Sequence, residues 1–300
     1  MINKKLKVLD LFSGIGGFSL GLQKTNYFET TLFCEIEKHC QRVLSKHFLN
    51  TPIHSDVKTL HVTPNEYDVM CGGFPCQDIS IGGKGAGITG ARSGLWFEFK
   101  RLIAEGKPKY VIIENVNALL SRGLSQILQD LAEVGYDASW TVFDSKYFGV
   151  PQRRRRVYII GVRDGIPASA DIFEFGRRDN SQHKQQMAIV DKSFTSNFEE
   201  KCTGRKLSYW TTQRSNQLAE CGLSNTIAKR DYKSATDLVL DNGKLRRVTP
   251  EERLRLQGFP DNWFDDCGLS TKQKFQCNGM TVPVVKHIGE LIQRFDNERI

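Results

Sequence analysis

The chain has 300 residues, and 42 Lys and Arg against 34 Asp and Glu give it a formal net charge of +8. This length suits one substantial α/β core plus a smaller lobe, and the positive charge favours a polyanionic partner. No apolar run is long enough to cross a bilayer, and residues 1–7 lack a signal-peptide core, so we expect a cytoplasmic protein. The eight cysteines show no Cys-x-x-Cys pair and no regular metal-ligand spacing, so we expect neither a metal site nor a disulfide framework.

A glycine-rich turn follows the first predicted strand. The apolar run at residues 7–12 predicts a buried strand, and residues 13–17 predict a tight turn into a helix. Glycines let the backbone approach a ligand closely, and the start of the helix offers free N–H groups. The turn alone is a weak signal, because ordinary turn chemistry explains it equally well.

Acidic residues follow the next two predicted strands. The strand at residues 31–34 ends at Glu35, where an acidic residue that holds a ribose is placed in dinucleotide-binding folds. A helix at 38–48 and a short strand at 52–54 lead to Asp56. Together with the glycine turn, these residues predict a site for an adenosyl cofactor. The alternative for Glu35 is an acidic residue that opens the following helix.

Cys76 follows a fourth predicted strand. The run at residues 67–71 ends in two glycines, and a rigid proline precedes the cysteine. Ligands bind at the carboxyl ends of strands in open α/β sheets, so Cys76 is a candidate nucleophile. A lone cysteine is otherwise a small buried hydrophobe. Residues 78–93 are rich in glycine and predict a lid over a bound substrate, or else a plain surface loop.

A carboxylate and a run of arginines follow at the same predicted edge. A helix at 94–105 and a strand at 110–113 lead to Glu114, which would share a pocket with Cys76 if their strands are neighbours. An amphipathic helix covers residues 124–131, and alternation at 137–148 predicts another strand. Four arginines then precede a buried strand at 157–162; alternation would place Arg154 and Arg156 on one face and Arg153 and Arg155 on the other.

The last part of the chain divides into a charged region and a helix. Residues 164–246 carry many charges, short apolar runs and little helical periodicity. A helix begins at Pro283 and carries an apolar stripe to Phe295.

In this order, the motifs resemble those of the DNA cytosine-5 methyltransferase family of bacterial or phage type. They are Asp10 to Gly17, Gly73 to Gln77, Glu114-Asn115-Val116, Gln152 to Arg156, Arg247 to Pro250, Leu256 to Pro260 and Asn278 to Val285. The resemblance covers most of the chain except roughly residues 176–243. It implies an α/β fold: a Rossmann-like S-adenosylmethionine-dependent methyltransferase sheet with a second, smaller target-recognition domain. Cys277-Asn278-Gly279 departs from the Gly-Asn usual before the final helix and leaves that turn's geometry open.

The resemblance also implies a reaction and its residues. A methyl group would pass from S-adenosylmethionine to C5 of cytosine, leaving S-adenosylhomocysteine. Cys76 would attack C6 of a flipped-out base, Glu114 would contact N3 and the amino group, and Arg154 and Arg156 would hold O2 or the nearby backbone. The matching cofactor-binding positions are Phe12, Ser13, Gly14, Gly16, Gly17, Glu35, Ile36, Asp56, Val57, Gly73, Pro75, Leu95 and Asn278. The matching DNA-binding positions are Ser80, Arg92, Gln152, Thr226, Ile227, Lys229 and Arg230.

By the same resemblance, residues 1–185, completed by 278–300, form the catalytic and cofactor-binding domain. Residues 186–245 form the target-recognition domain, and 246–277 form a hinge segment. Exposed-loop interpretations stay open for Ser80, Arg92 and the basic residues near 229–233. We expect a monomer that acts on double-stranded DNA, is nucleoid-associated while acting, and works beside a companion restriction endonuclease, although an orphan or phage role is equally open.

Three alternatives compete with this interpretation. The same chemistry on RNA is the runner-up, but the full-sized variable lobe favours DNA. A catalytically silent DNA-binding regulator would not need Cys76 and Glu114. A nicotinamide-dependent dehydrogenase would explain the glycine turn and Glu35 but would leave Pro75-Cys76-Gln77 and the arginine run without a role. The recognised bases and the methylated position stay open.

Overall fold

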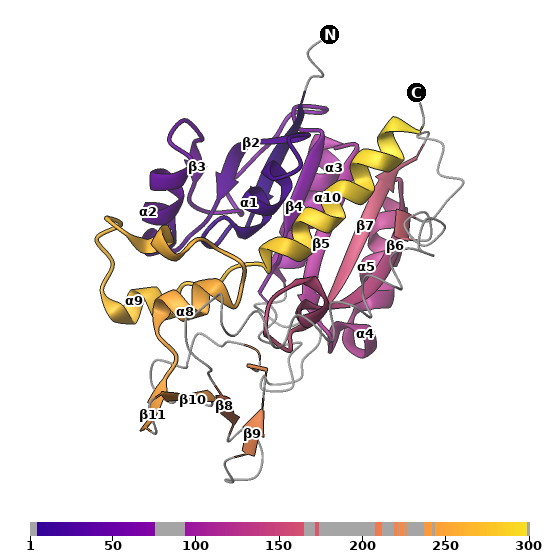
Figure 1. The fold of residues 1–300 in the computed structure, drawn as a ribbon. Helices are drawn as coiled ribbons and strands as arrows, with labels where there is room; N and C mark the ends of the chain where they lie inside the picture. The colour runs from indigo at the N-terminus through magenta and orange to yellow at the C-terminus, as the bar shows by residue number, and fades with distance from the viewer. Residues whose placement is uncertain are drawn as a thin grey trace.

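The structure of the protein is a computed structural model. It describes residues 5–75, 94–164, 172–173, 208–211, 219–221, 223–224, 226, 237–241 and 244–298. Within these residues, no helix is long and apolar enough to cross a membrane. The predicted Rossmann-like α/β fold is confirmed, with two sheets of very different size (Figure 1).

A seven-stranded sheet forms the centre of the larger lobe, in the order β3-β2-β1-β4-β5-β7-β6. Its strands are β1 (Leu6–Leu11), β2 (Phe28–Cys34), β3 (Ile53–His54), β4 (Val69–Gly72), β5 (Tyr110–Val116), β6 (Tyr136–Asp144) and β7 (Arg155–Arg163). Among these strands β7 runs antiparallel to its neighbours. Strand order reverses between β1 and β4, and such a switch point opens a crevice at the carboxyl ends of the strands.

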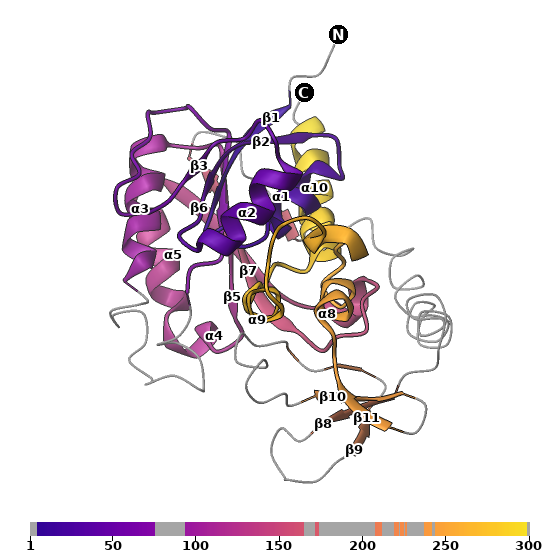
Figure 2. The same cartoon turned by 90° about the vertical axis from the view of Figure 1, so that its left-hand side faces the viewer.

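Helices cover both faces of this sheet. Figure 2 shows α3 (Leu95–Gly106) and α5 (Leu124–Glu133) on one face, and α1 (Gly17–Gln23) and α10 (Val282–Asn297) on the other. Each face has its own buried cluster of side chains. The first cluster includes Trp96 and Ile113, and the second includes Phe28. Burial on both faces explains why the central strands β4, β5 and β7 are largely apolar.

Helix α10 completes the lobe although it follows the smaller sheet in the chain. It packs along α1, where a Cβ added to Gly21 would lie 2.6 Å from Cβ of Val285. Near its end Asp296 accepts hydrogen bonds from the hydroxyls of Tyr27 at 2.6 Å and Tyr110 at 2.8 Å, and from Lys109. These contacts fasten α10 to β5 and to the residue before β2.

A third buried cluster joins the segment before α10 to helix α2 (Lys38–His47). The segment contains α8 (Pro250–Arg255), η4 (Asp261–Phe264) and α9 (Thr271–Gln276). Trp263 stacks on His47 with ring centroids 3.6 Å apart, and its indole N–H donates to the carbonyl of Ile15 at 3.0 Å. Most of the predicted hinge segment therefore packs on the larger lobe.

The smaller sheet lies within and just after the predicted recognition segment. Its antiparallel strands are β8 (Ser208–Thr211), β9 (Ala219–Cys221), β10 (Asp237–Asp241) and β11 (Lys244–Arg247), in the order β11-β10-β8-β9. Figure 1 shows this sheet beyond the carboxyl edge of the large sheet. The larger lobe also contains the short helices α4 (Leu119–Arg122) and η2 (Ser145–Phe148).

Candidate active site

The glycine turn lies at the carboxyl end of β1. Phe12, Gly14 and Gly16 have positive φ angles of 54°, 55° and 83°. The value at Phe12 is unusual for a residue with a side chain, and such backbone conformations concentrate at binding sites. Ser13 does not point outward, since its hydroxyl donates to the carbonyls of Asp10 at 2.5 Å and Cys34 at 3.3 Å. The turn is thus held rigidly between β1 and β2.

Glu35 bridges this turn to the start of α2. One carboxylate oxygen accepts the N–H of Gly14 at 2.7 Å, and the other accepts the N–H of Glu37 at 2.8 Å. The side chain is buried, whereas its neighbour Ile36 is 66% exposed. An acidic group and an exposed apolar side chain therefore lie together beside the glycine turn.

The residues before α10 pack against the same turn. A Cβ added to Gly14 would lie 2.8 Å from the carbonyl oxygen of Asn278, and one added to Gly17 would lie 2.7 Å from the backbone of Met280. The Oδ1 atom of Asn278 is buried and has no hydrogen-bond partner among the described residues. Buried polar atoms are nearly always paired, so this oxygen is a candidate to accept a hydrogen bond from a ligand.

Glu114 lies at the carboxyl edge with two of the arginines. Its Oε1 atom is 3.1 Å from Nε of Arg156 and 3.5 Å from Nη2 of Arg154. Arg153 and Arg155 are exposed. The structure thus confirms the predicted division of the arginine run between two faces. A carboxylate and two guanidinium groups with little contact with water form a charged cluster that can orient a polar ring.

The strand that leads to Cys76 lies beside this cluster. β4 pairs with β5 in parallel, as the shared pocket requires. A Cβ added to Gly73 would lie 2.9 Å from Oε2 of Glu114, and the side-chain amide of Asn115 donates to the carbonyl of Phe74 at 3.2 Å. Cys76 itself lies outside the described residues, but the described chain reaches Pro75 at this point.

The described part of the recognition segment touches the arginine run. The N–H of Arg153 donates to the carbonyl of Ser224 at 2.8 Å, and the hydroxyl of Thr226 donates to the carbonyl of Arg153 at 3.0 Å. The side chain of Gln152 is fully buried here. Its assignment to DNA and that of Thr226 stay predictions. Ser80, Arg92, Ile227, Lys229 and Arg230 lie outside the described residues.

Comparison with known proteins decides what this site belongs to. The model of the family described as C-5 cytosine-specific DNA methylase matches residues 6–294. The chain belongs to this family. It is a DNA cytosine-5-methyltransferase, and the family implies S-adenosylmethionine as the methyl donor.

Several curated relatives support the assignment. The methyltransferase is 31% identical over 310 residues to the Type II methyltransferase M1.ScrFI of Lactococcus lactis subsp. cremoris, covering 95% of this chain and 77% of the relative. It is also 31% identical to the Type II methyltransferase M.NgoBI of Neisseria gonorrhoeae, covering 93% and 90%. Both matches run through the catalytic motifs and the recognition segment.

Solved structures share the fold. The Entamoeba histolytica methyltransferase EhMeth superposes with a TM-score of 0.67 at 18% identity, covering 98% of this chain and 99% of that one. The Dnmt2 methyltransferase of Schizosaccharomyces pombe gives 0.63 at 18% identity, covering 97% and 100%. At this identity the likeness concerns the fold alone.

Of the remaining predicted cofactor positions of the methyltransferase, Asp56 and Val57 follow β3 and Leu95 begins α3. Their role in binding the cofactor stays a prediction. Val57 is buried, Asp56 is half-buried and accepts the N–H of Lys58 at 3.0 Å, and Leu95 packs against the core under α3. Gly16 faces the ring of Phe48, where an added Cβ would lie 2.8 Å away. This glycine therefore serves packing as well as turn geometry.

Two residues in the site were not assigned a role from sequence. Gln257 accepts the N–H of Gly279 at 2.8 Å through Oε1, and its amide donates to the carbonyl of Arg253 at 2.9 Å. Gln257 therefore connects the end of α8 to the turn that holds Asn278. Met280 touches Gly73 and Gly17. Gln257 lies in the motif Leu256 to Pro260, and Met280 lies in the motif Asn278 to Val285. The family resemblance of these motifs is the sequence signal that points to both residues.

Asp10 is a further buried acidic residue under the site. Its Oδ2 atom accepts hydrogen bonds from the hydroxyl of Ser19 at 2.7 Å and from the N–H of Ser19 at 3.3 Å. Burial raises the pKa of Asp10 to about 7 in spite of these hydrogen bonds, and the nearby charge of Glu35 adds to the rise. The proton of this carboxyl is therefore coupled to the folding of the glycine turn.

Proposed function

We propose that the enzyme methylates a cytosine rotated out of double-stranded DNA, through a transient bond between Sγ of Cys76 and C6 of the base. The observation that carries the proposal is the position of Gly73 against Oε2 of Glu114. Because Cys76 is three residues further along the chain, its thiol can reach a ring that Glu114 binds. A base within a duplex is inaccessible at C6, so rotation out of the stack is required.

The proposed reaction places negative charge on the cytosine ring, and the residues around the ring stabilise that charge. The Cys76 thiol loses its proton to solvent as its sulfur bonds to C6, and the π electrons of the C5–C6 bond move toward C5 and N3. Glu114, as the carboxylic acid or through a shared proton, bonds N3 and the amino group and stabilises this charge. C5 then takes the methyl group, the proton on C5 leaves to a base, and the C6–S bond breaks to restore the aromatic ring.

Arg154 and Arg156 have two roles in this scheme. Their guanidinium groups hold the Glu114 carboxyl in place, and their remaining N–H groups reach O2 of the base or the neighbouring backbone. Guanidinium groups suit both roles because their planar donors match carbonyl and phosphate oxygens.

The residues around the glycine turn fit S-adenosylmethionine. Gly14, Gly16 and Gly17 keep the backbone of the turn free of side chains, the buried Oδ1 of Asn278 has no hydrogen-bond partner among the described residues, and Ile36 exposes an apolar surface suited to an adenine ring. Glu35 would hold the ribose, with the other positions assigned from sequence lining the site: Phe12, Ser13, Asp56, Val57, Gly73, Pro75 and Leu95. When bound, the cofactor supplies an electrophilic methyl group.

We propose that DNA lies between the two lobes. The catalytic lobe comprises residues 1–185 and 278–300, the recognition lobe 186–245, and a connecting segment 246–277. The small antiparallel sheet supports this arrangement, as do the hydrogen bonds that join Arg153 to Ser224 and Thr226, which lie between β9 and β10. Gln152, Thr226, Ile227, Lys229 and Arg230 would contact DNA in the cleft, with Ser80 and Arg92 contributing from the segment after Cys76.

We also propose that the enzyme acts as a monomer that protects the site of a companion restriction endonuclease. The Type II names of the relatives support this role. Genomic DNA from cells that express the enzyme should then resist one endonuclease whose site matches the methylated sequence. Cleavage of that DNA by every endonuclease with a matching site would contradict the role.

Bisulfite sequencing tests the reaction and the sequence context together. DNA from cells that express the wild-type enzyme should gain 5-methylcytosine in one motif, and DNA from cells with Cys76→Ala should not. A 5-fluorocytosine duplex should form a covalent adduct with the wild-type enzyme and cofactor. An adduct with RNA but not DNA would move the activity to RNA, and absence of any adduct would overturn the covalent mechanism.

A further inference from the structure

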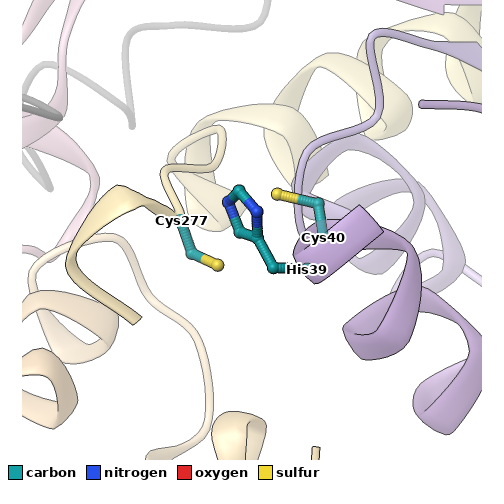
Figure 3. Close-up of side chains that lie close together, drawn as sticks. All are labelled: His39, Cys40 and Cys277. Carbon is teal, nitrogen blue, oxygen red and sulfur yellow. The ribbon is translucent and has the colours of Figure 1, made fainter. Parts of the chain in front are cut away.

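A histidine and two cysteines from distant parts of the chain converge beside the proposed cofactor site. His39 and Cys40 lie in the first turn of α2, and Cys277 follows α9. One ligand atom from each residue lies within 4.8 Å of the others, and the described residues contain no other such group. Figure 3 shows the imidazole ring between the two thiols.

Packing of the third core cluster holds these groups together. The side chains of Cys40 and Cys277 are 3% and 2% exposed, and both thiols are free rather than joined in a disulfide. Both thiols and the imidazole of His39 therefore meet at one point between α2 and the turn after α9. Two free thiols that converge on an imidazole make an arrangement that core packing alone does not require.

The donor set matches a borderline-soft cation. Zn²⁺ binds cysteine sulfur and histidine nitrogen in tetrahedral sites, and softer or harder ions prefer other sets. A carboxylate lies next to the ring, with Oε2 of Glu37 3.7 Å from Nδ1 of His39. Acidic groups beside a metal-binding imidazole fix the ring and raise its basicity.

We propose that His39, Cys40 and Cys277 bind a zinc-class divalent cation, with water as the fourth ligand. His39 is the outermost of the three, with 13% of its side chain exposed, and gives the ion a path to the site. Each thiol loses its proton as its sulfur bonds the ion, so the reaction needs no oxidant.

The site would link two parts of the cofactor crevice. Cys277 precedes Asn278, whose carbonyl lies against Gly14, and Cys40 belongs to the helix that follows Glu35. A bound ion therefore fastens the turn before α10 to the start of α2. This binding is independent of methyl transfer and does not rest on the proposed role of Cys76.

Titration of the full-length reduced protein with Co²⁺ tests the proposal directly. We expect one equivalent of Co²⁺ to give thiolate-to-cobalt charge-transfer absorption and the d–d bands of tetrahedral cobalt, and Zn²⁺ to displace it. Cys40→Ala, Cys277→Ala and His39→Gln should each weaken or abolish the signal. Zn²⁺ should raise the melting temperature of the wild-type protein, because a ligand that binds the folded state stabilises it.

Two control variants make the outcome decisive. Cys267→Ala removes another buried thiol of the same core cluster and should keep the signal. Cys76→Ala should keep it as well, which separates metal binding from catalysis. An absent charge-transfer band, or a band that survives in both Cys40→Ala and Cys277→Ala, would overturn the site. A Cys40–Cys277 disulfide, detected by mass spectrometry in protein that binds no metal, would also overturn it. If the cysteine variants misfold, His39→Gln takes their place in the cobalt titration.

Discussion

Oε1 of Glu114 lies 3.1 Å from Nε of Arg156, across two antiparallel strands that bring both residues to the edge of the sheet. Both side chains are mostly buried. An ion pair withdrawn from water costs desolvation free energy and is retained where geometry or specificity requires it. Here the pair fixes the carboxyl beside Gly73, where the proposed mechanism needs it.

Replacement of Glu114 by Gln should lower methyl transfer strongly. The amide keeps the size of the side chain but cannot act as an acid, so the negative charge that develops on the ring at N3 is less well stabilised. We expect a loss of roughly 10²- to 10³-fold in single-turnover rate, measured with a radiolabelled methyl group. Affinity for the cofactor should change little. Glu133→Gln, an exposed substitution on α5, is the matched control, and an unchanged rate in Glu114→Gln would remove its catalytic role.

Replacement of Gly279 by Ala should disturb the turn before α10. An added Cβ would lie 2.7 Å from the ring of Phe259, which is too close. Overpacking of this kind costs roughly 1–3 kcal/mol, and cofactor affinity should fall with it. Urea unfolding and equilibrium dialysis measure the two effects. At Gly161 the nearest atoms are 3.5 Å away, so Gly161→Ala should be neutral; equal behaviour of the two variants would contradict the packing argument.

Replacement of Asp10 by Asn should change how stability depends on pH. The folded pKa of Asp10 is raised from 3.8 to about 7, so the folded state binds a proton that the unfolded state has lost. The contribution of Asp10 to the free energy of unfolding is therefore greatest below pH 4. It falls as the pH rises toward 7, by on the order of 4 kcal/mol.

Asn cannot ionise, so the stability of Asp10→Asn should lack this part of the pH dependence. Relative to the wild type, the variant should therefore become more stable from pH 5 to pH 8, two values on either side of the raised pKa of about 7. Urea unfolding at the two pH values measures it. Asp137→Asn, an exposed substitution on β6, is the control. A wild-type pH profile in Asp10→Asn would show that the buried carboxyl does not take up a proton in this range.

Replacement of Arg153 by Gln should weaken DNA binding mainly at low salt. Arg153 is exposed next to the recognition segment, and its N–H bond to Ser224 does not involve the side chain. Loss of one phosphate contact lowers the slope of log affinity against log salt by about 1. Fluorescence anisotropy over a salt series measures this. Lys24→Gln, at the far end of α1, should keep the slope, and a salt-independent affinity in the wild type would contradict phosphate binding.

The sequence predicted the centre of the sheet well because β4, β5 and β7 contain apolar runs buried on both faces. The strand expected at 31–34 begins at Phe28, since Glu29 and Thr31 interrupt the run although they pair within β2. Alternation along the arginine run predicted its division between faces. Position at strand ends likewise predicted that Glu35 lies beside the glycine turn.

Contacts that join distant segments could not be predicted in this way. Spacing of the cysteines argued against a metal site, but Cys277 approaches Cys40 only because the segment that begins with α8 packs on α2. Similarly, the bond from Gly279 to Gln257 depends on how two loops meet in space. In the recognition segment neither periodicity nor spacing predicted the small antiparallel sheet.

The position of α10 has a consequence for biosynthesis. The face of the sheet that carries Phe28 and Ile160 is covered in part by residues of α10, including Ile288 and Ile292. A ribosome must therefore extend the nascent chain through the recognition segment and α10 before this surface can close. Until then an apolar sheet face stays open to chaperones and to aggregation, so slow synthesis of this enzyme should make its yield depend on chaperone supply.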